Sequence, residues 1–180
     1  DADVVVLCEV DHRVWRSRFR NQTQMLAKRL GYHALFAPAR RGAENRSALL
    51  TAIPLGGRAV SVAGAHLQNA GRSGSGRIEA IAQLAVVTAA MAARPNPALI
   101  TGDFNLTEEC VEPAFAGAGL TAVPTGPTYP YPNARRRIDW MGVRGLKVVS
   151  SEAVALYGSD HLAITADLMP AGRDGPQPEK

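Results

Sequence analysis

Residues 97–105 combine an apolar run with two side chains that could do chemistry. The run Pro97-Ala98-Leu99-Ile100-Thr101 leads directly into Gly102-Asp103-Phe104-Asn105. A carboxylate and a carboxamide therefore lie two residues apart where a buried strand is expected to end, which is where α/β proteins present functional groups. By itself, an Asp at a strand end often only closes a turn.

Other polar side chains end or interrupt apolar runs in the same way. They are the carboxylates Glu9, Asp139 and Asp160 and the imidazoles His66 and His161. If these groups converge, carboxylate repulsion costs stability unless a cation offsets it. An oxygen-rich cluster suits Mg²⁺, Mn²⁺ or Ca²⁺ better than zinc. The pattern thus predicts a site for a hard divalent metal.

Such a metal is the usual partner of phosphate oxygens, where it offsets transition-state charge and positions a nucleophilic water. An Asp hydrogen-bonded to a His holds the ring in one tautomer and stabilises its charged form. Asp139 and His161 are the candidates for that pair. Taken singly, Glu9, His66 and Asp139 fit structural roles equally well, so the prediction depends on all the sites together.

Five short motifs, in this order along the chain, resemble those of the endonuclease/exonuclease/phosphatase family, which includes the exonuclease III and deoxyribonuclease I types. The resemblance implies a four-layered α/β sandwich, in which two mixed β-sheets pack face to face and helices flank them. The motifs are Leu-Cys-Glu-Val-Asp at 7–11, Ala-His-Leu at 65–67, Gly-Asp-Phe-Asn at 102–105, Arg-Ile-Asp at 137–139 and Ser-Asp-His at 159–161.

The resemblance also implies a Mg²⁺-dependent phosphodiester or phosphomonoester hydrolase site at one end of the sandwich. In that site Glu9 would be a metal ligand and Asp160 a second carboxylate at the metal, with Mn²⁺ as an alternative ion. Family members normally begin with a strand that ends in Asn and joins Glu9 at the metal. No such strand precedes Glu9 here, so we expect an N-terminally shortened member, and a catalytically silent binding domain stays open.

The catalytic residues implied by the resemblance come from the remaining motifs. Asp103 would orient or activate the attacking water, and Asn105 would hold the phosphate. His161, oriented by Asp139, would contact the scissile phosphate and share in proton transfer. His66 resembles a second histidine of the deoxyribonuclease and sphingomyelinase branches, placed for the phosphate or the leaving group.

The substrate class is left open by the sequence. Arginines at 40, 41, 46 and 135–137 could hold DNA phosphates, although 135–137 reads more simply as a solvated turn. His66 also makes a phospholipid or inositol phosphate head group an alternative. The net charge of +4 is compatible with a phosphate-bearing ligand and equally with an ordinary basic protein.

Composition indicates one domain. With 180 residues, 46% of them hydrophobic, the chain can bury one substantial core. We assign residues 1–169 to this domain and expect 170–180, rich in Pro and Gly, to be a disordered tail. Two cysteines are too few for a disulfide framework, and no apolar run reaches the ~18 residues of a membrane span. We expect a monomer, and nothing indicates a compartment.

The expected elements alternate between strands and helices, with strands in excess. The Gly-Gly pair at 56–57 permits positive φ and predicts a hairpin. Ile78, Ile81, Leu84, Ala85, Thr88 and Met91 are expected on the buried face of the second helix. We expect strands over 4–8, 32–36, 48–53, 59–65, 98–101, 138–143, 146–155 and 162–168, and helices over 16–30, 77–94 and 109–116.

Overall fold

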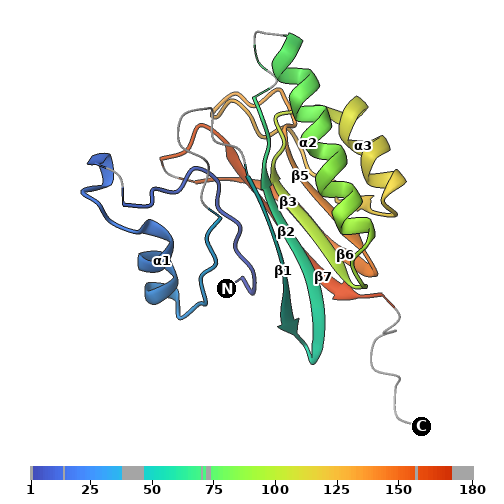
Figure 1. Ribbon diagram of the computed structural model, residues 1–180, viewed down its shortest axis with the longest axis horizontal. Helices are drawn as coiled ribbons and strands as arrows, with labels where there is room; N and C mark the ends of the chain where they lie inside the picture. Colours follow the sequence, from blue (N-terminus) through green and yellow to red (C-terminus); the bar gives the residue numbers. More distant parts are fainter. Residues whose placement is uncertain are drawn as a thin grey trace.

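The computed structural model describes residues 2–13, 15–37, 47–69, 71, 74–156 and 158–171. Two sheets pack face to face, and the helices α2 (Gly74–Ala92) and α3 (Glu108–Gly117) cover the outer face of the larger one (Figure 1). The other helices are η1 (Trp15–Ser17, a short 3₁₀ turn) and α1 (Gln22–Leu30). The strands are β1 (Ser47–Leu55), β2 (Arg58–His66), β3 (Ala98–Asp103), β4 (Thr121–Ala122), β5 (Asp139–Arg144), β6 (Leu146–Ala155) and β7 (Leu162–Pro170).

The larger sheet has the strand order β1-β2-β3-β5-β4 and is mixed, because only β2 and β3 are parallel. The smaller sheet pairs β6 with β7 and is antiparallel, whereas a mixed sheet was expected. Gly56 and Gly57 both adopt positive φ in the β1–β2 turn, which confirms the predicted hairpin. The sandwich architecture predicted from the sequence is confirmed.

Alternation along the central strands divides the core into two parts. One face presents small side chains such as Ala63 and Ala65 to the helices, where Leu84 and Phe115 pack with Trp140. The opposite face presents side chains to the β6–β7 sheet, among them Val62, Leu99 and Met141, against Ile164 and Leu168. This period of two is what places a central strand between two layers.

Helix α2 buries a face that overlaps only in part with the one expected, since Leu84, Thr88 and Met91 are buried as predicted. Ile78 is 72% exposed and Ile81 41% exposed, and Ala85 is exposed as well. The buried face carries Ala80, Leu84, Val87, Thr88 and Met91. These buried residues also recur at helical spacing, and the small Ala80 side chain lets the helix approach the sheet. The hydrophobic pattern alone does not show which of the two faces is buried.

Two expected strands in the first 37 residues are wrong, and one expected helix ends at Leu30 as predicted but is shorter than expected. The run 4–8 is extended, with Val5 and Leu7 about half exposed, but it pairs with no neighbouring strand in the described part of the chain, and 32–36 forms no strand either. The helix expected over 16–30 begins only at Gln22, because Arg18 and Phe19 adopt positive φ and Asn21 caps the helix by accepting a hydrogen bond from the Gln24 amide.

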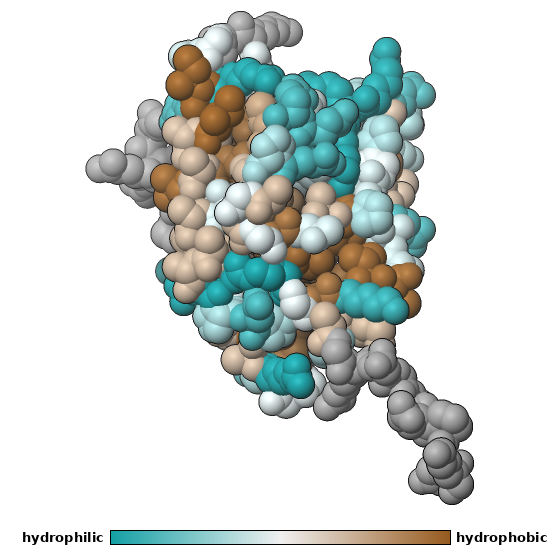
Figure 2. Space-filling view, turned by 90° about the vertical axis from the view of Figure 1, so that its right-hand side faces the viewer, coloured by the Kyte–Doolittle hydropathy of each residue, from teal (hydrophilic) through white to brown (hydrophobic). Residues whose placement is uncertain are grey.

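The far end of the chain corrects one further boundary. Pro170 is the last residue of β7, so it belongs to the sheet rather than to the expected tail. Residues 172–180, and the arginines at 40, 41 and 46, lie outside the described residues. No helix in the described ranges has the length and apolar character needed to span a bilayer. The face shown in Figure 2 carries both hydrophilic and hydrophobic side chains.

Packing between β5 and α3 generates a testable prediction. A Cβ added at Gly142 would lie 2.5 Å from Cε2 of the Phe115 ring, which is 1% exposed. We expect Gly142→Ala to lower the free energy of unfolding by about 1–3 kcal/mol through overpacking, measured by urea denaturation. Gly126→Ala, where nothing lies within 4 Å of the added Cβ, is the matched control. Equal stability of the two variants would contradict this packing.

Candidate active site

The ends of three neighbouring strands set the frame of the site. Gly102 has φ +142°, and a Cβ there would lie 1.9 Å from the Ala65 carbonyl oxygen, so only glycine fits. This close approach accompanies a register that pairs His66 with Asp103 across β2 and β3, and Asp103 with Asp139 across β3 and β5. Paired residues point to the same face, so three functional side chains form one row.

Asp103 and Asn105 close a tight turn at the end of β3. Asp103 Oδ1 accepts a hydrogen bond from the Asn105 backbone amide at 2.9 Å, and Oδ2 accepts one from Asn105 Nδ2 at 3.2 Å. Nδ2 also donates to the Leu67 carbonyl at 3.2 Å. Asn105 has φ 53°, a left-handed conformation that Asn tolerates. A phosphate contact from this amide would therefore replace one of these two hydrogen bonds.

Between these side chains, Phe104 anchors the turn in the core. It is fully buried and meets Phe115 edge to face, with ring centroids 5.7 Å apart. The indole of Trp140, also fully buried, donates a hydrogen bond from Nε1 to the Leu106 carbonyl at 2.8 Å. The loop after β3 is thus tied to β5 as well as to its own strand.

His66 stands beside two carboxylates. Its Nε2 lies 3.3 Å from Asp103 Oδ2 and 3.9 Å from Glu9 Oε1. The His66 and Asp103 side chains are both 11% exposed, whereas that of Glu9 is 73% exposed. A protonated His66 would therefore offset part of the negative charge at this end of the sheet.

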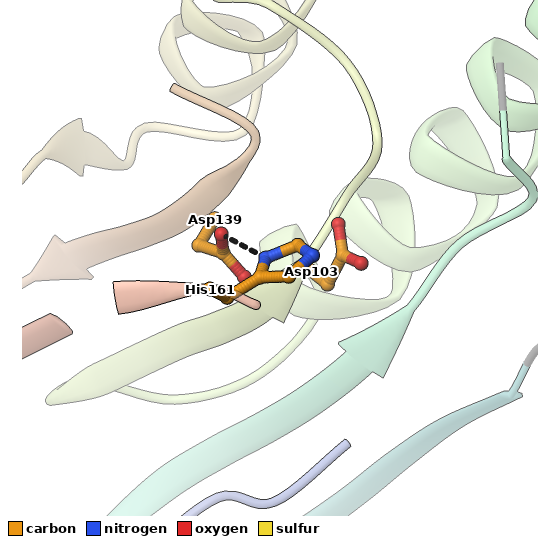
Figure 3. A group of neighbouring side chains, drawn as sticks. All are labelled: Asp103, Asp139 and His161. Atoms are coloured by element: carbon orange, nitrogen blue, oxygen red, sulfur yellow. Dashed lines mark hydrogen bonds and ion pairs between the residues drawn. The ribbon is translucent and has the colours of Figure 1, made fainter. Parts of the chain in front are cut away.

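Asp139 and His161 form the predicted pair. Nδ1 of His161 lies 2.8 Å from Asp139 Oδ2, a hydrogen bond that joins β5 to the residue just before β7 (Figure 3). This hydrogen bond is the main cause of a raised pKa of His161, which burial partly opposes, and the charges of Asp139, Asp103 and Asp160 raise it further. Asp103, Asp139 and His161 each offer a ligand atom, and these atoms lie within 4.8 Å of one another.

Thr128 holds the two halves of that pair in place. Its buried hydroxyl accepts hydrogen bonds from the backbone amides of Ile138 at 3.4 Å and Asp139 at 3.3 Å. Its carbonyl accepts one from the Leu162 amide at 2.7 Å, next to His161. The sequence analysis missed Thr128, because a lone Thr in a proline-rich loop gives no signal for such a contact.

Tyr129 and Tyr131 extend this support. The Tyr129 ring lies over His161 with centroids 4.7 Å apart, and the Tyr131 amide donates to the Asp160 carbonyl at 2.7 Å. Asp160 is exposed, and it lines the same cleft as Tyr129 and His161. The loop from Thr128 to Tyr131 therefore orders the Asp-His motif before β7.

One cleft of about 1450 Å³ receives all the side chains predicted for the site. It is lined by Glu9, His66, Asp103, Asn105, Asp139, Asp160 and His161, together with Tyr129 and Arg136. Cys8 also lines this cleft, where burial raises the pKa of its thiol to about 11. The thiol is therefore neutral near pH 7 and contributes no charge.

Of the arginines at 135–137, only the first two fit a solvated turn. Arg135 and Arg136 are exposed. The half-buried Arg137 donates to the Val123 carbonyl at 2.6 Å, and its guanidinium lies 3.8 Å from the centre of the Trp140 ring. Arg137 is thus a packing residue beneath the site, and the expectation of a solvated turn is wrong for it.

Comparison with known proteins shows the family of the chain. A family model described as Endonuclease/Exonuclease/phosphatase family matches residues 1–161. An endonuclease/exonuclease/phosphatase from Beutenbergia cavernae DSM 12333 is similar, with 26% identity and a TM-score of 0.57. The alignment covers 72% of this chain and 40% of that one. Comparison with curated proteins gives no match.

Two further solved structures share the fold. Staphylococcus aureus beta toxin with bound magnesium ions is 19% identical with a TM-score of 0.54, covering 68% of this chain and 57% of that one. D. rerio TDP2 in complex with a single-strand DNA product is 17% identical with a TM-score of 0.56, covering 72% and 64%. This chain therefore spans between two fifths and two thirds of the length of these similar structures.

The Asp139–His161 hydrogen bond predicts a pH dependence. Because folding raises the pKa of His161, the protonated pair stabilises the fold below the ordinary value of about 6.5, and this contribution is lost as pH rises through the folded value. We expect Asp139→Asn to lower the His161 pKa, measured by NMR titration of the metal-free protein. Thr128→Val should lower it less, because it only loosens Asp139. Glu79→Gln, on the distant α2, is the control, and an unchanged His161 pKa in Asp139→Asn would contradict the pairing.

Proposed function

Because the chain belongs to the endonuclease/exonuclease/phosphatase family, we propose that it is a divalent-metal-dependent hydrolase of phosphate esters, of the phosphodiesterase or nuclease type. One observation carries the proposal: a row of His66, Asp103 and Asp139 across three strand ends, completed by His161 from the edge of the other sheet. A phosphate ester entering the cleft would meet carboxylates for a metal and imidazoles for proton transfer.

The donor set fits Mg²⁺ or Mn²⁺. Glu9, Asp103 and Asp160 line the cleft and offer carboxylate oxygens, which these ions prefer. We assign Glu9 and Asp160 as the ligands, and the similar beta toxin structure contains magnesium ions. When bound, the ion would neutralise charge on the phosphate oxygens.

Asp139 prepares His161 for its role. By accepting the Nδ1 hydrogen bond, it fixes the tautomer and leaves Nε2 for the substrate, and Figure 3 shows this ring lying between Asp139 and Asp103. The raised pKa of His161 keeps more of the ring protonated near neutral pH, which favours contact with an anionic phosphate and donation of a proton to the leaving oxygen.

The other residues act on the attacking water and on the phosphate. Asp103, held by Asn105, orients the attacking water and takes up its proton. Asn105 contacts a phosphate oxygen by exchanging one of its present hydrogen bonds. His66, 3.3 Å from Asp103, lies ready for the phosphate or the leaving group.

Removing the metal or the key side chains tests this proposal. We expect the chain to hydrolyse bis(p-nitrophenyl) phosphate with Mg²⁺, and excess chelator to abolish the turnover. Asp160→Ala and His161→Ala should each lower kcat/KM by about 10²-fold or more, since each removes a group that acts on the reacting phosphate. Glu79→Ala and His33→Ala, both exposed and outside the cleft, are the matched controls.

Turnover that resists chelator would contradict metal-dependent hydrolysis. Binding of Mg²⁺ or Mn²⁺ in calorimetry without any turnover would instead support the catalytically silent binding domain. Loss of activity in the control variants would show that the assay reports folding rather than chemistry.

The exposed Arg135 and Arg136 could both contact the phosphates of a nucleic acid, and Arg136 lines the cleft, so we propose a nucleic acid as the substrate rather than a phospholipid or inositol phosphate. We expect DNA binding to weaken steeply as salt rises, and Arg135→Gln/Arg136→Gln to reduce that salt slope by roughly 2, because each phosphate contact releases counterions. Fluorescence anisotropy over a salt series measures both effects, with Arg94→Gln as control. A flat response would favour the phospholipid or inositol phosphate class.

A further inference from the structure

Residues 12–37 form the most basic part of the chain that the structure describes. They hold six of the 20 Lys and Arg residues and none of the 16 Asp and Glu residues. The rest of the chain therefore carries a net negative charge, although the whole chain is basic. In Figure 1 this blue segment, with α1, stands apart from α2 and α3, on the other side of β1.

Within it, residues 13–20 form a closed loop, called here the Arg13–Arg20 loop. The Arg13 amide donates to the Arg20 carbonyl at 2.9 Å, and the Gln22 amide donates to the Asp11 carbonyl at 3.0 Å. These hydrogen bonds hold the two ends of the loop together.

Two aromatic side chains project from this loop into solvent. Trp15 is 82% exposed and Phe19 62% exposed, and their rings meet edge to face with centroids 6.1 Å apart. By contrast, Trp140 and Phe104 are completely buried in the core. An exposed aromatic pair costs free energy in water and marks a contact surface.

The same loop carries positively charged side chains. Arg13, Arg18 and Arg20 are all exposed, and the sequence has no Asp or Glu between residues 12 and 37. A loop that exposes both aromatic rings and arginines is complementary to a surface whose outer layer is anionic and whose interior is apolar.

We propose that the Arg13–Arg20 loop docks this protein on an anionic phospholipid bilayer. Trp15 and Phe19 enter the interfacial region, where aromatic rings partition favourably, and the arginines contact lipid phosphates. This docking is independent of hydrolysis at the cleft, because none of these residues lines it.

Two observations favour a bilayer over a single-stranded nucleic acid. The Trp15 and Phe19 planes are inclined by 79°, so two consecutive bases with parallel planes cannot stack on both rings. Leu26 and Leu30, one turn apart on the adjoining α1, are 40% and 56% exposed. Aliphatic side chains gain nothing from phosphates or bases, whereas a bilayer interface accommodates them.

The two tryptophans make the test direct. Trp15 is exposed and Trp140 is fully buried, so a blue shift of the emission on adding vesicles reports Trp15. We expect this shift, with co-sedimentation of the full chain, on phosphatidylcholine vesicles that contain phosphatidylglycerol, and weak binding to phosphatidylcholine alone. Trp15→Phe should keep the co-sedimentation and lose the shift.

Substitutions separate the two contributions. We expect Trp15→Ala/Phe19→Ala to lower the partition coefficient by roughly tenfold or more. Arg18→Gln/Arg20→Gln should lower it by about tenfold and reduce its dependence on salt. Val86→Ala, which is 70% exposed on α2 in the native chain, and Arg58→Gln in the β1–β2 turn are the matched controls. Circular dichroism checks that each variant folds.

Three outcomes would overturn the proposal. The first is equal binding to vesicles with and without phosphatidylglycerol, and the second is equal binding by the loop variants and their controls. The third is a Trp15 emission change with single-stranded DNA but none with vesicles, which would make the loop a nucleic-acid contact.

Discussion

The close contact between Gly102 and the Ala65 carbonyl is the constraint on which the site depends. At this point β2 and β3 approach so tightly that no side chain fits, and both strands end one residue later with His66 and Asp103 side by side. The antiparallel pairing of β3 with β5 then brings Asp139 into the same row. Three functional groups thus owe their spacing to backbone register, which is harder to perturb than a set of side-chain rotamers.

Two contacts between histidines and carboxylates stand at this row of side chains. The row places two carboxylates beside each other, and a histidine from a different element stands against each of them, His66 Nε2 at 3.3 Å from Asp103 and His161 Nδ1 at 2.8 Å from Asp139. Both contacts cross between elements, because His161 comes from the segment before β7. The Asp139–His161 hydrogen bond therefore requires that the two sheets be packed together.

Local patterns predicted the central part of the fold well. The apolar run before Gly-Asp-Phe-Asn predicts a strand over 98–101, which β3 extends to Asp103, and the Gly-Gly pair predicts the hairpin, because both depend on residues adjacent in sequence. The Asp139–His161 pair was predicted from the residue types at the ends of apolar runs, and the resemblance of motifs implied the same pair. By contrast, no local pattern indicates that the Thr128 hydroxyl accepts a hydrogen bond from the Asp139 backbone amide, since that contact is set by tertiary structure. The apolar run at 4–8 has the local pattern of a strand and yet forms none, because a strand also needs a partner with which to pair.

Phe104 has a consequence for how this site can vary. It lies between the two polar residues of the turn and packs on Phe115, which in turn meets Trp140 edge to face. Phe104 therefore links the aromatic core to the polar turn at the end of β3, and a change in either moves the other. Mutational tolerance should accordingly be low along this aromatic chain and high in the exposed loops around the cleft. New specificities would then arise by exchanging loops over a nearly invariant centre, with selection on stability and on activity acting upon the same few side chains.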